Sequence, residues 1–125
     1  MNTYLLQDWV SLSGDATAAS TIVSQPSAAW LDLAHASELT FFLEVSRKVG
    51  APQMKYDTAP LREGAMFQEL ASFAMPTTTT PLVTPISLYT NPAIAVARWV
   101  RWRVYSDVGS VWDVTFRLSV MAYRR

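Results

Sequence analysis

The sequence contains no cysteine and a single histidine, His35. The missing thiols exclude disulfides, thiol catalysis and thiolate metal sites. One histidine without a cluster of further ligands does not indicate a metal site, so we interpret His35 as a loop residue. The sequence also lacks a nucleophile elbow, a phosphate-binding loop and a dinucleotide fingerprint. These absences predict a protein that is not an enzyme, with no catalytic residue, no bound metal and no cofactor.

Charged residues are scarce, at 16% of the 125 residues, where about 25% is typical of soluble domains. Hydrophobic residues make up 50% of the chain, which is enough for the core of one domain spanning residues 1–125. Two alternatives explain the low charge: loops of Thr, Ser and Ala solvate the surface, or a partner covers part of it. The net charge of zero predicts no general attraction to nucleic acid or to an anionic membrane.

The charges are distributed unevenly along the chain. Residues 1–97 hold eight acidic and four basic residues, whereas residues 98–125 hold six arginines and two aspartates. Either these charges pair within the domain, or a basic edge docks on an acidic neighbour, which could be another copy. The N-terminal residues have no basic start and no long apolar run, so we expect neither a signal peptide nor a membrane span.

The clearest pattern is an alternation of apolar and polar residues near the C-terminus. Every second residue from Trp112 to Ala122 is apolar, and a period of two predicts a strand with one face in the core. The preceding run alternates as well. Its apolar face comprises Val96, Val100, Trp102 and Val104, and its other face comprises Trp99, Arg101, Arg103 and Tyr105.

Residues 106–110 separate these two runs and predict a tight turn. A three-residue loop that ends in Gly109 suits a type I turn followed by a left-handed residue, because glycine lacks a Cβ atom. The two runs then form a hairpin. In its register Arg103 faces Asp113 as an ion pair, and Trp99 faces Arg117 as a cation–π pair.

Shorter alternating runs predict further strands at residues 3–13, 21–24, 30–33, 38–49, 53–58 and 82–89, and the first of these could instead be an extended N-terminal arm. Pro85 places the last of them at a sheet edge or bulge, because proline cannot donate to the ladder. Residues 61–75 are ambiguous between a short helix and a loop followed by a strand, and the β-rich surroundings favour the second. About eight strands predict an all-β, two-sheet antiparallel β-sandwich of the jelly-roll type.

The outer stripe of Trp99, Arg101 and Tyr105 has arginines between flanking aromatic residues. Three interpretations are open: a neighbouring loop or arm covers the stripe, a protein binds it, or sugar rings or bases stack on it. We expect interface residues at Trp9, Trp99, Arg101, Tyr105 and Arg117. For Trp9, packing in the core or at its rim is favoured over a role as a ligand platform.

Three pieces of the chain form a familiar succession. They are residues 30–33 with 38–45, residues 57–60 with 62–64 and 67–73, and residues 97–104 with the closing strand 114–120. This succession resembles small jelly-roll proteins of tailed bacteriophage virions, including head decoration (cement) proteins. The resemblance covers residues 30–123. It departs from the usual pattern at residues 61–63, where an acid-Gly pair would make a tighter loop.

The resemblance implies a structural virion protein that binds the outer surface of an icosahedral capsid and bridges neighbouring subunits. Its partners would be the major capsid protein and copies of itself, without nucleic acid or membrane. It would lie on the capsid surface after assembly in the host cytoplasm. Residues 1–13, the threonine-rich loop 76–81 and the face of Trp99 and Arg101 would form the interfaces. The alternatives are a carbohydrate-binding jelly-roll module and a tail-associated adhesion protein.

Overall fold

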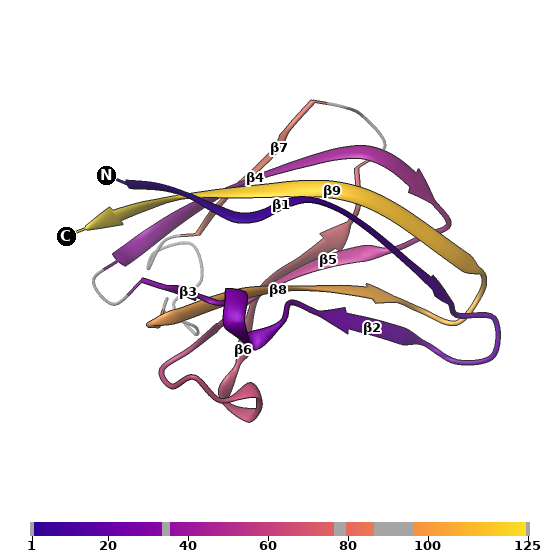
Figure 1. The fold of residues 1–125 in the computed structure, drawn as a ribbon, viewed down its shortest axis with the longest axis horizontal. Coiled ribbons are helices and arrows are strands. Elements are labelled where there is room, and N and C mark those ends of the chain that lie inside the picture. Colours follow the sequence, from indigo (N-terminus) through magenta and orange to yellow (C-terminus); the bar gives the residue numbers. More distant parts are fainter. Residues whose placement is uncertain (1, 34–35, 77–79, 87–96, 125) are drawn as a thin grey trace.

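The computed structural model describes residues 2–33, 36–76, 80–86 and 97–124, which form nine β-strands and two short 3₁₀ helices. In chain order these are β1 (Asn2–Asp15), β2 (Thr21–Ser24), η1 (Ser27–Ala29), β3 (Leu31–Asp32), β4 (Ala36–Val49), β5 (Gln53–Ala59), η2 (Gly64–Met66), β6 (Gln68–Ala74), β7 (Leu82–Ile86), β8 (Trp99–Ser106) and β9 (Val111–Arg124). The strands form two layers, and β1 begins at the end of the sandwich where β9 finishes (Figure 1).

The two sheets have the strand order of a jelly roll. Sheet A has the order β1-β9-β4-β7, and sheet B has the order β2-β8-β5-β6, with β3 also paired to β8. β2 and β3 therefore act as one interrupted strand, and the chain alternates between the sheets except at the β5–β6 hairpin. Every strand pair is antiparallel. The predicted all-β sandwich of jelly-roll type is confirmed.

Most of the predicted strands are present. β2, β4, β5 and β9 lie where the alternation placed them, and residues 3–13 lie within β1, which pairs with β9. The ambiguous stretch 61–75 is a loop containing η2 followed by β6, as favoured. Pro85 lies in β7, an edge strand that pairs with β4. Residue 35, residues 77–79 and residues 87–96 lie outside the described part, and so do the predictions that fall on them.

The predicted hairpin between β8 and β9 is wrong. β8 belongs to sheet B and β9 to sheet A, so the turn between them crosses from one layer to the other. In the strand register Arg103 lies opposite Lys55, while the side chain of Asp113 pairs with Arg47 at 3.2 Å. The apolar faces of β8 and β9 point into the same core whether the two strands form a hairpin in one sheet or lie in opposite sheets. The alternation was therefore correct, although it could not distinguish the two connections.

The predicted left-handed glycine is also in a different turn. Gly109 does not have a positive φ; among the described residues Gly50, between β4 and β5, has one, at 77°. Only glycine adopts this conformation readily. A Cβ atom at position 50 would also lie 2.7 Å from the carbonyl oxygen of Val111.

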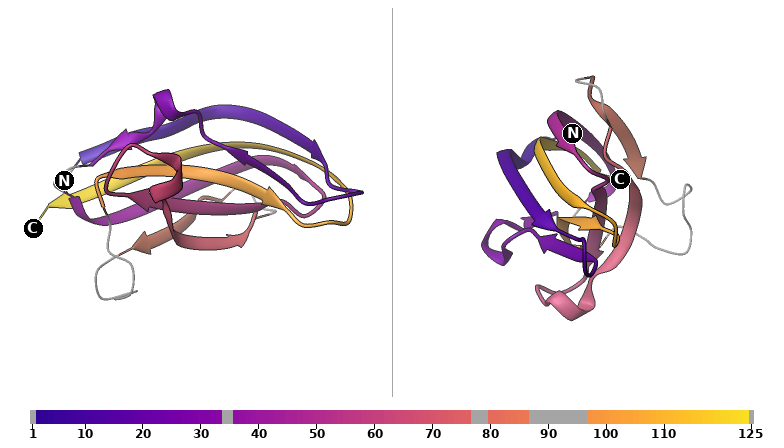
Figure 2. Two further views of the ribbon diagram at one scale, coloured as in Figure 1. Left: turned by 90° about the horizontal axis from the view of Figure 1, so that it is seen from below. Right: turned by 90° about the vertical axis from the view of Figure 1, so that its right-hand side faces the viewer.

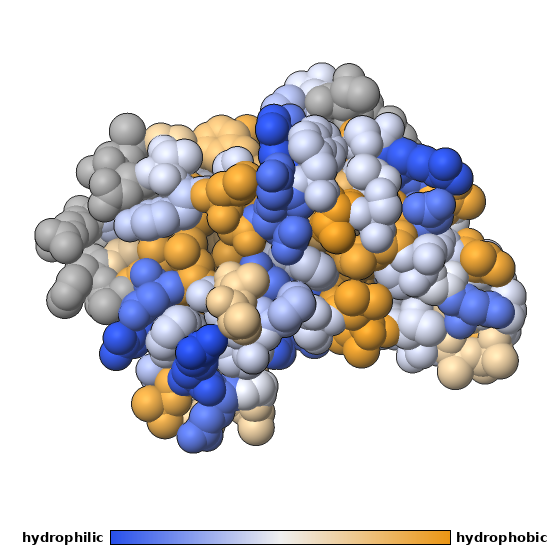
Figure 3. Space-filling view, viewed as in Figure 1, coloured by the Kyte–Doolittle hydropathy of each residue, from blue (hydrophilic) through white to orange (hydrophobic). Residues whose placement is uncertain are grey.

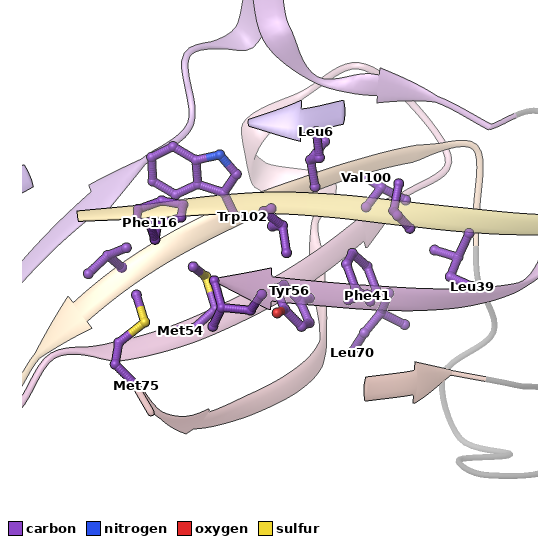
Figure 4. Packing of buried hydrophobic residues seen from close by; sticks show 14 of the residues in the cluster. Leu6, Leu39, Phe41, Met54, Tyr56, Leu70, Met75, Val100, Trp102 and Phe116 are labelled. Carbon is purple, nitrogen blue, oxygen red and sulfur yellow. The ribbon is translucent and has the colours of Figure 1, made fainter. Parts of the chain in front are cut away.

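The core lies between the two sheets and contains the apolar faces that the alternation predicted. Aromatic side chains join the layers: Phe41 of sheet A stacks on Tyr56 of sheet B with ring centres 3.9 Å apart, and Trp102 meets Phe116 edge to face at 5.1 Å (Figure 4). Burial raises the pKa of the Tyr56 phenol, which therefore stays protonated. Other fully buried side chains are Leu39, Leu43, Met54, Val100, Val104, Trp112, Val114, Leu118 and Val120.

A β-bulge in β1 determines the direction of Trp9. Gln7 pairs with Leu118 and Val10 pairs with Phe116, so Asp8 and Trp9 together oppose one residue of β9. Such a bulge redirects side chains and bends the strand. Trp9 consequently points away from the core and keeps 45% of its surface exposed.

The buried side chain of Gln25 links the two sheets at this point. Its amide nitrogen donates to the carbonyl of Leu6 in β1 at 2.8 Å and to the carbonyl of Ala29 at 3.1 Å. Its amide oxygen accepts from the backbone N–H of Trp102 at 3.4 Å. Gln25 thereby satisfies backbone groups beside the interruption between β2 and β3.

Candidate interaction surfaces

The outer face of sheet B contains a buried cluster of charges centred on Asp57. The Asp57 carboxylate accepts from Nε of Arg101 at 3.1 Å and from Nη2 of Arg103 at 2.9 Å, with a second contact from Nε of Arg103. Its side chain is only 1% exposed. Lys55 extends the cluster through Glu69 at 2.9 Å. Because a buried charge is costly unless it is paired, the two arginines offset the burial of the Asp57 carboxylate.

Two loops cover this cluster. The guanidinium carbon of Arg101 lies 3.9 Å from the ring centre of Phe67 and 5.4 Å from that of Trp30, and these two rings meet edge to face at 4.8 Å. Nη2 of Arg62 ties the loops together by donating to the Ser27 carbonyl at 2.8 Å. The loops that carry Trp30 and Phe67 therefore lie on sheet B (Figure 2). Only 12% of the Arg101 side chain remains exposed.

Trp99 and Tyr105 lie at the two ends of the same stripe, on the outer face as predicted. The guanidinium groups of Arg62 and Arg98 lie over the Trp99 ring, each 5.4 Å from its centre. Hydrogen bonding to Asp32, reinforced by charge attraction, raises the pKa of Arg98. Tyr105 donates to Asp107 at 3.0 Å. The structure thus supports the interpretation that neighbouring loops cover much of the stripe.

Trp9 and Arg117 come together on the opposite side of the molecule, on the outer face of sheet A. The guanidinium carbon of Arg117 lies 5.0 Å from the centre of the Trp9 ring. Nη2 of Arg117 also donates to both carboxylate oxygens of Glu44 at 2.9 Å. The predicted pair of Trp99 with Arg117 is therefore wrong, since Arg117 belongs to sheet A and contacts Trp9.

The uneven distribution of charge is balanced by pairing within the domain. Arg98, Arg101, Arg103 and Arg117 of the C-terminal region pair with Asp32, Asp57 and Glu44 of the N-terminal region. Long-range strand pairing brings these segments together. The arginines in these pairs do not form a free basic edge.

A further apolar surface, which the sequence did not predict, lies at the end of the sandwich away from the N-terminus. Val49, Val108 and Val111 are each about half exposed there, and we call these three residues the valine end. Backbone hydrogen bonds of Ala16 with Gly109 and Ser110 join the connection after β1 to the β8–β9 turn. The feature of the sequence that could have indicated this surface is Val108, an apolar residue between Asp107 and Gly109 in a turn.

The described ranges contain no candidate metal site. Within them, no group of three or more His, Cys, Asp or Glu residues could hold a metal ion. Nor does any helix among these residues have the length and apolar character needed to cross a membrane. What the structure does offer is apolar surface. Exposed apolar side chains lie on the outer face of sheet A and at the valine end, and apolar residues also gather along the edge that carries β1 and β2 (Figure 3).

The fold and these surfaces define a jelly-roll β-sandwich with exposed apolar side chains. Comparison of the sequence with protein-family models finds no match, and comparison with curated protein sequences finds none either. Among solved structures the chain is similar to part of a chain in a structure of infectious bursal disease virus, Gx strain, with 13% identity and a TM-score of 0.44. The match covers 98% of this chain, which spans 31% of the length of the other.

Proposed function

We propose that this protein is a structural component of a virion, of the capsid decoration (cement) type found in tailed bacteriophages. It binds the outer capsid surface, contacts the major capsid protein and bridges neighbouring subunits, after assembly in the host cytoplasm. The resemblance of residues 30–123 to such proteins supports this function. The proposal needs no catalytic residue, cofactor, nucleic acid or membrane.

The valine end is the observation that carries the proposal, because it gathers three half-exposed apolar side chains at one end of the sandwich. Three connections between strands converge there. Val108 lies in the β8–β9 turn, while Val49 ends β4 and Val111 begins β9. Burying the exposed half of a valine contributes about 1 kcal/mol. Many copies on one shell would add this contribution at every junction where internal DNA pressure pulls capsid subunits apart.

The test is binding of the purified protein to shells of the same virus that lack it. We expect the protein to sediment with the shells and to raise the temperature at which they break open. Val108→Asp places a charge in the apolar contact and should lower binding at least tenfold. Leu61→Asp is the matched control, because Leu61 is also about half exposed but lies in the loop before η2. Shells that neither bind the protein nor gain stability from it would refute the function.

The alternatives of a carbohydrate-binding module and of a tail-associated adhesion protein require an aromatic platform for sugars. Trp99 is the residue we expected in that role. Arg62 and Arg98 lie over its ring, which leaves less of the indole face for a sugar. A glycan array that gives a specific hit, lost in a folded Trp99→Ala variant, would favour this alternative over the capsid role.

A further inference from the structure

Two neighbouring rows on the outer face of sheet A place at least one apolar side chain on each of its four strands. The strand register places Leu5, Ser119, Phe42 and Val83 in one row, from β1 through β9 and β4 to β7. The next row contains Thr3, Met121, Thr40 and Pro85. Leu5 is 56% exposed and Val83 is 50% exposed. Apolar side chains gathered in this way on one face indicate a contact surface.

This face carries two acid–base pairs, and Glu38 lies opposite Tyr123 near the end where the chain starts. Arg117 and Glu44 lie side by side on β9 and β4, in the row that also contains Trp9. At the end of the face toward the valine end, Arg47 pairs with Asp113. A face of this kind is complementary to itself. When a second copy is turned over, its central row runs in the opposite order, so that its base lies against the acid of the first copy and its acid against the base.

We propose that this face packs against the same face of a second copy of the chain, about a two-fold axis that runs parallel to the strands between β9 and β4. This operation places β9 on the partner's β4 and β1 on the partner's β7. Each row of residues then lies against the same row of the partner, which runs in the opposite order, from β7 to β1. Leu5 faces the partner's Val83 and Phe42 faces the partner's Ser119, so that a large side chain lies over a small one.

The same axis aligns the charges. Arg117 faces the partner's Glu44, and Glu44 faces the partner's Arg117. Packed sheets lie about 10 Å apart, a distance that an arginine and a glutamate extending from opposite sheets can span. Two acids and two bases then alternate around the axis. The Trp9 rings, each next to Arg117, lie at the rim of the contact.

The area of the face is sufficient for such a dimer. Four strands about 4.8 Å apart give a width of about 19 Å, and the 14 residues of β9, at about 3.4 Å each, give a length of about 48 Å. Because β7 has only five residues, the outline is smaller than this full rectangle, at about 770 Å² for each copy. A standard protein interface buries about 800 Å² for each partner.

The dimer goes beyond the proposed function and also explains how a small protein bridges two subunits. A two-fold axis parallel to the strands leaves both valine ends pointing in the same direction. One dimer thus presents two apolar ends to one surface. Self-association is measured without any shell, so its failure and the failure of shell binding are distinguishable.

The first test is the mass of the protein in solution, by light scattering and sedimentation across concentration. We expect a dimer for the natural chain. Leu5→Lys and Val83→Lys change side chains that are half exposed in the single chain, so both variants should fold, and each should weaken the dimer at least tenfold. Leu61→Lys is the matched control on the loop before η2 and should leave the dimer unchanged. A chain that stays monomeric at several hundred micromolar, or equal weakening by all three variants, would overturn the proposal.

The second test uses the charge row. Arg117→Glu gives one copy two acids in this row, and Glu44→Arg gives another copy two bases, so each variant alone should be mostly monomeric. Mixing the two variants should restore a dimer containing one copy of each, detected by mass. Circular dichroism of each variant establishes that it is folded. Two folded variants that remain monomeric after mixing would overturn the proposed axis.

Discussion

The indole ring of Trp112 lies directly against the backbone of Gly14. The two residues are opposite each other in the register of β1 and β9, and a Cβ atom at position 14 would come within 2.5 Å of Trp112 Nε1. That nitrogen donates to Thr21 Oγ1 at 2.7 Å, at the start of β2. The close approach therefore positions the ring that joins sheet A to the first strand of sheet B.

Replacing Gly14 by alanine should destabilise the fold, because the new Cβ atom would overlap the ring of Trp112, which is fully buried. Overpacking of this kind costs about 1–3 kcal/mol, and urea unfolding measures it. Gly109→Ala is the control, since no atom lies within 4 Å of a Cβ at that position. Equal midpoints for the two variants would contradict the packing described here.

Replacing Asp57 by alanine should be among the most damaging single changes in sheet B. It leaves Arg101 and Arg103 without the carboxylate that both of them contact. Breaking a buried ion pair from one side costs about 3–5 kcal/mol. The control is Asp113→Ala, which breaks the largely exposed pair with Arg47, and exposed pairs contribute about 0–1 kcal/mol. Thermal unfolding of both variants tests the difference, and a loss for Asp57→Ala no larger than that of the control would be inconsistent with a buried cluster.

Replacing Gln25 by leucine keeps the volume but removes the amide that links the sheets. The carbonyls of Leu6 and Ala29 would lose their side-chain donor, at a cost of about 1–3 kcal/mol for each buried group left unpaired. We expect lower stability in urea and faster hydrogen exchange near the β1 bulge. Gln7→Leu is the control, because Gln7 donates only to the exposed carbonyl of its neighbour Asp8. Unchanged exchange at the bulge in Gln25→Leu would show that the link is unimportant.

The exposed carboxylate of Asp15 provides a prediction about pH. Hydrogen bonds from the Thr17 hydroxyl and then from its backbone N–H lower the pKa of Asp15. Since the folded pKa lies below the unfolded one, these bonds stabilise the fold above the ordinary aspartate range and stop doing so as the pH falls through the lowered pKa. Thr17→Ala should raise the pKa of Asp15, as followed by NMR titration, whereas Thr17→Ser should preserve it. A pKa that is the same in all three proteins would rule out this explanation.

Prediction from the sequence identified the strand face on which the expected interface residues lie, but not what covers them. It placed Trp99, Arg101 and Tyr105 on one outward face because strand alternation is a local property, and the structure agrees. It did not foresee that Trp30 and Phe67 cover Arg101, because those loops approach β8 only after sheet B has formed. Trp9 and Arg117 are 108 residues apart in the chain, and the β1–β9 pairing and the bulge bring them together.

The sequence by itself determined the strands and their inward faces, because a period of two in hydrophobicity acts within each segment whatever its neighbours are. Only the tertiary structure decided which strands pair. Val104 and Trp112 point into the same core whether β8 and β9 lie in one sheet or in opposite sheets. Arg103 could pair with Asp113 or with another carboxylate such as Asp57. The long-range pairing of strands makes Asp57 the partner of Arg103. β5, which carries Asp57, lies beside β8 in sheet B, whereas Asp113 lies in the other sheet.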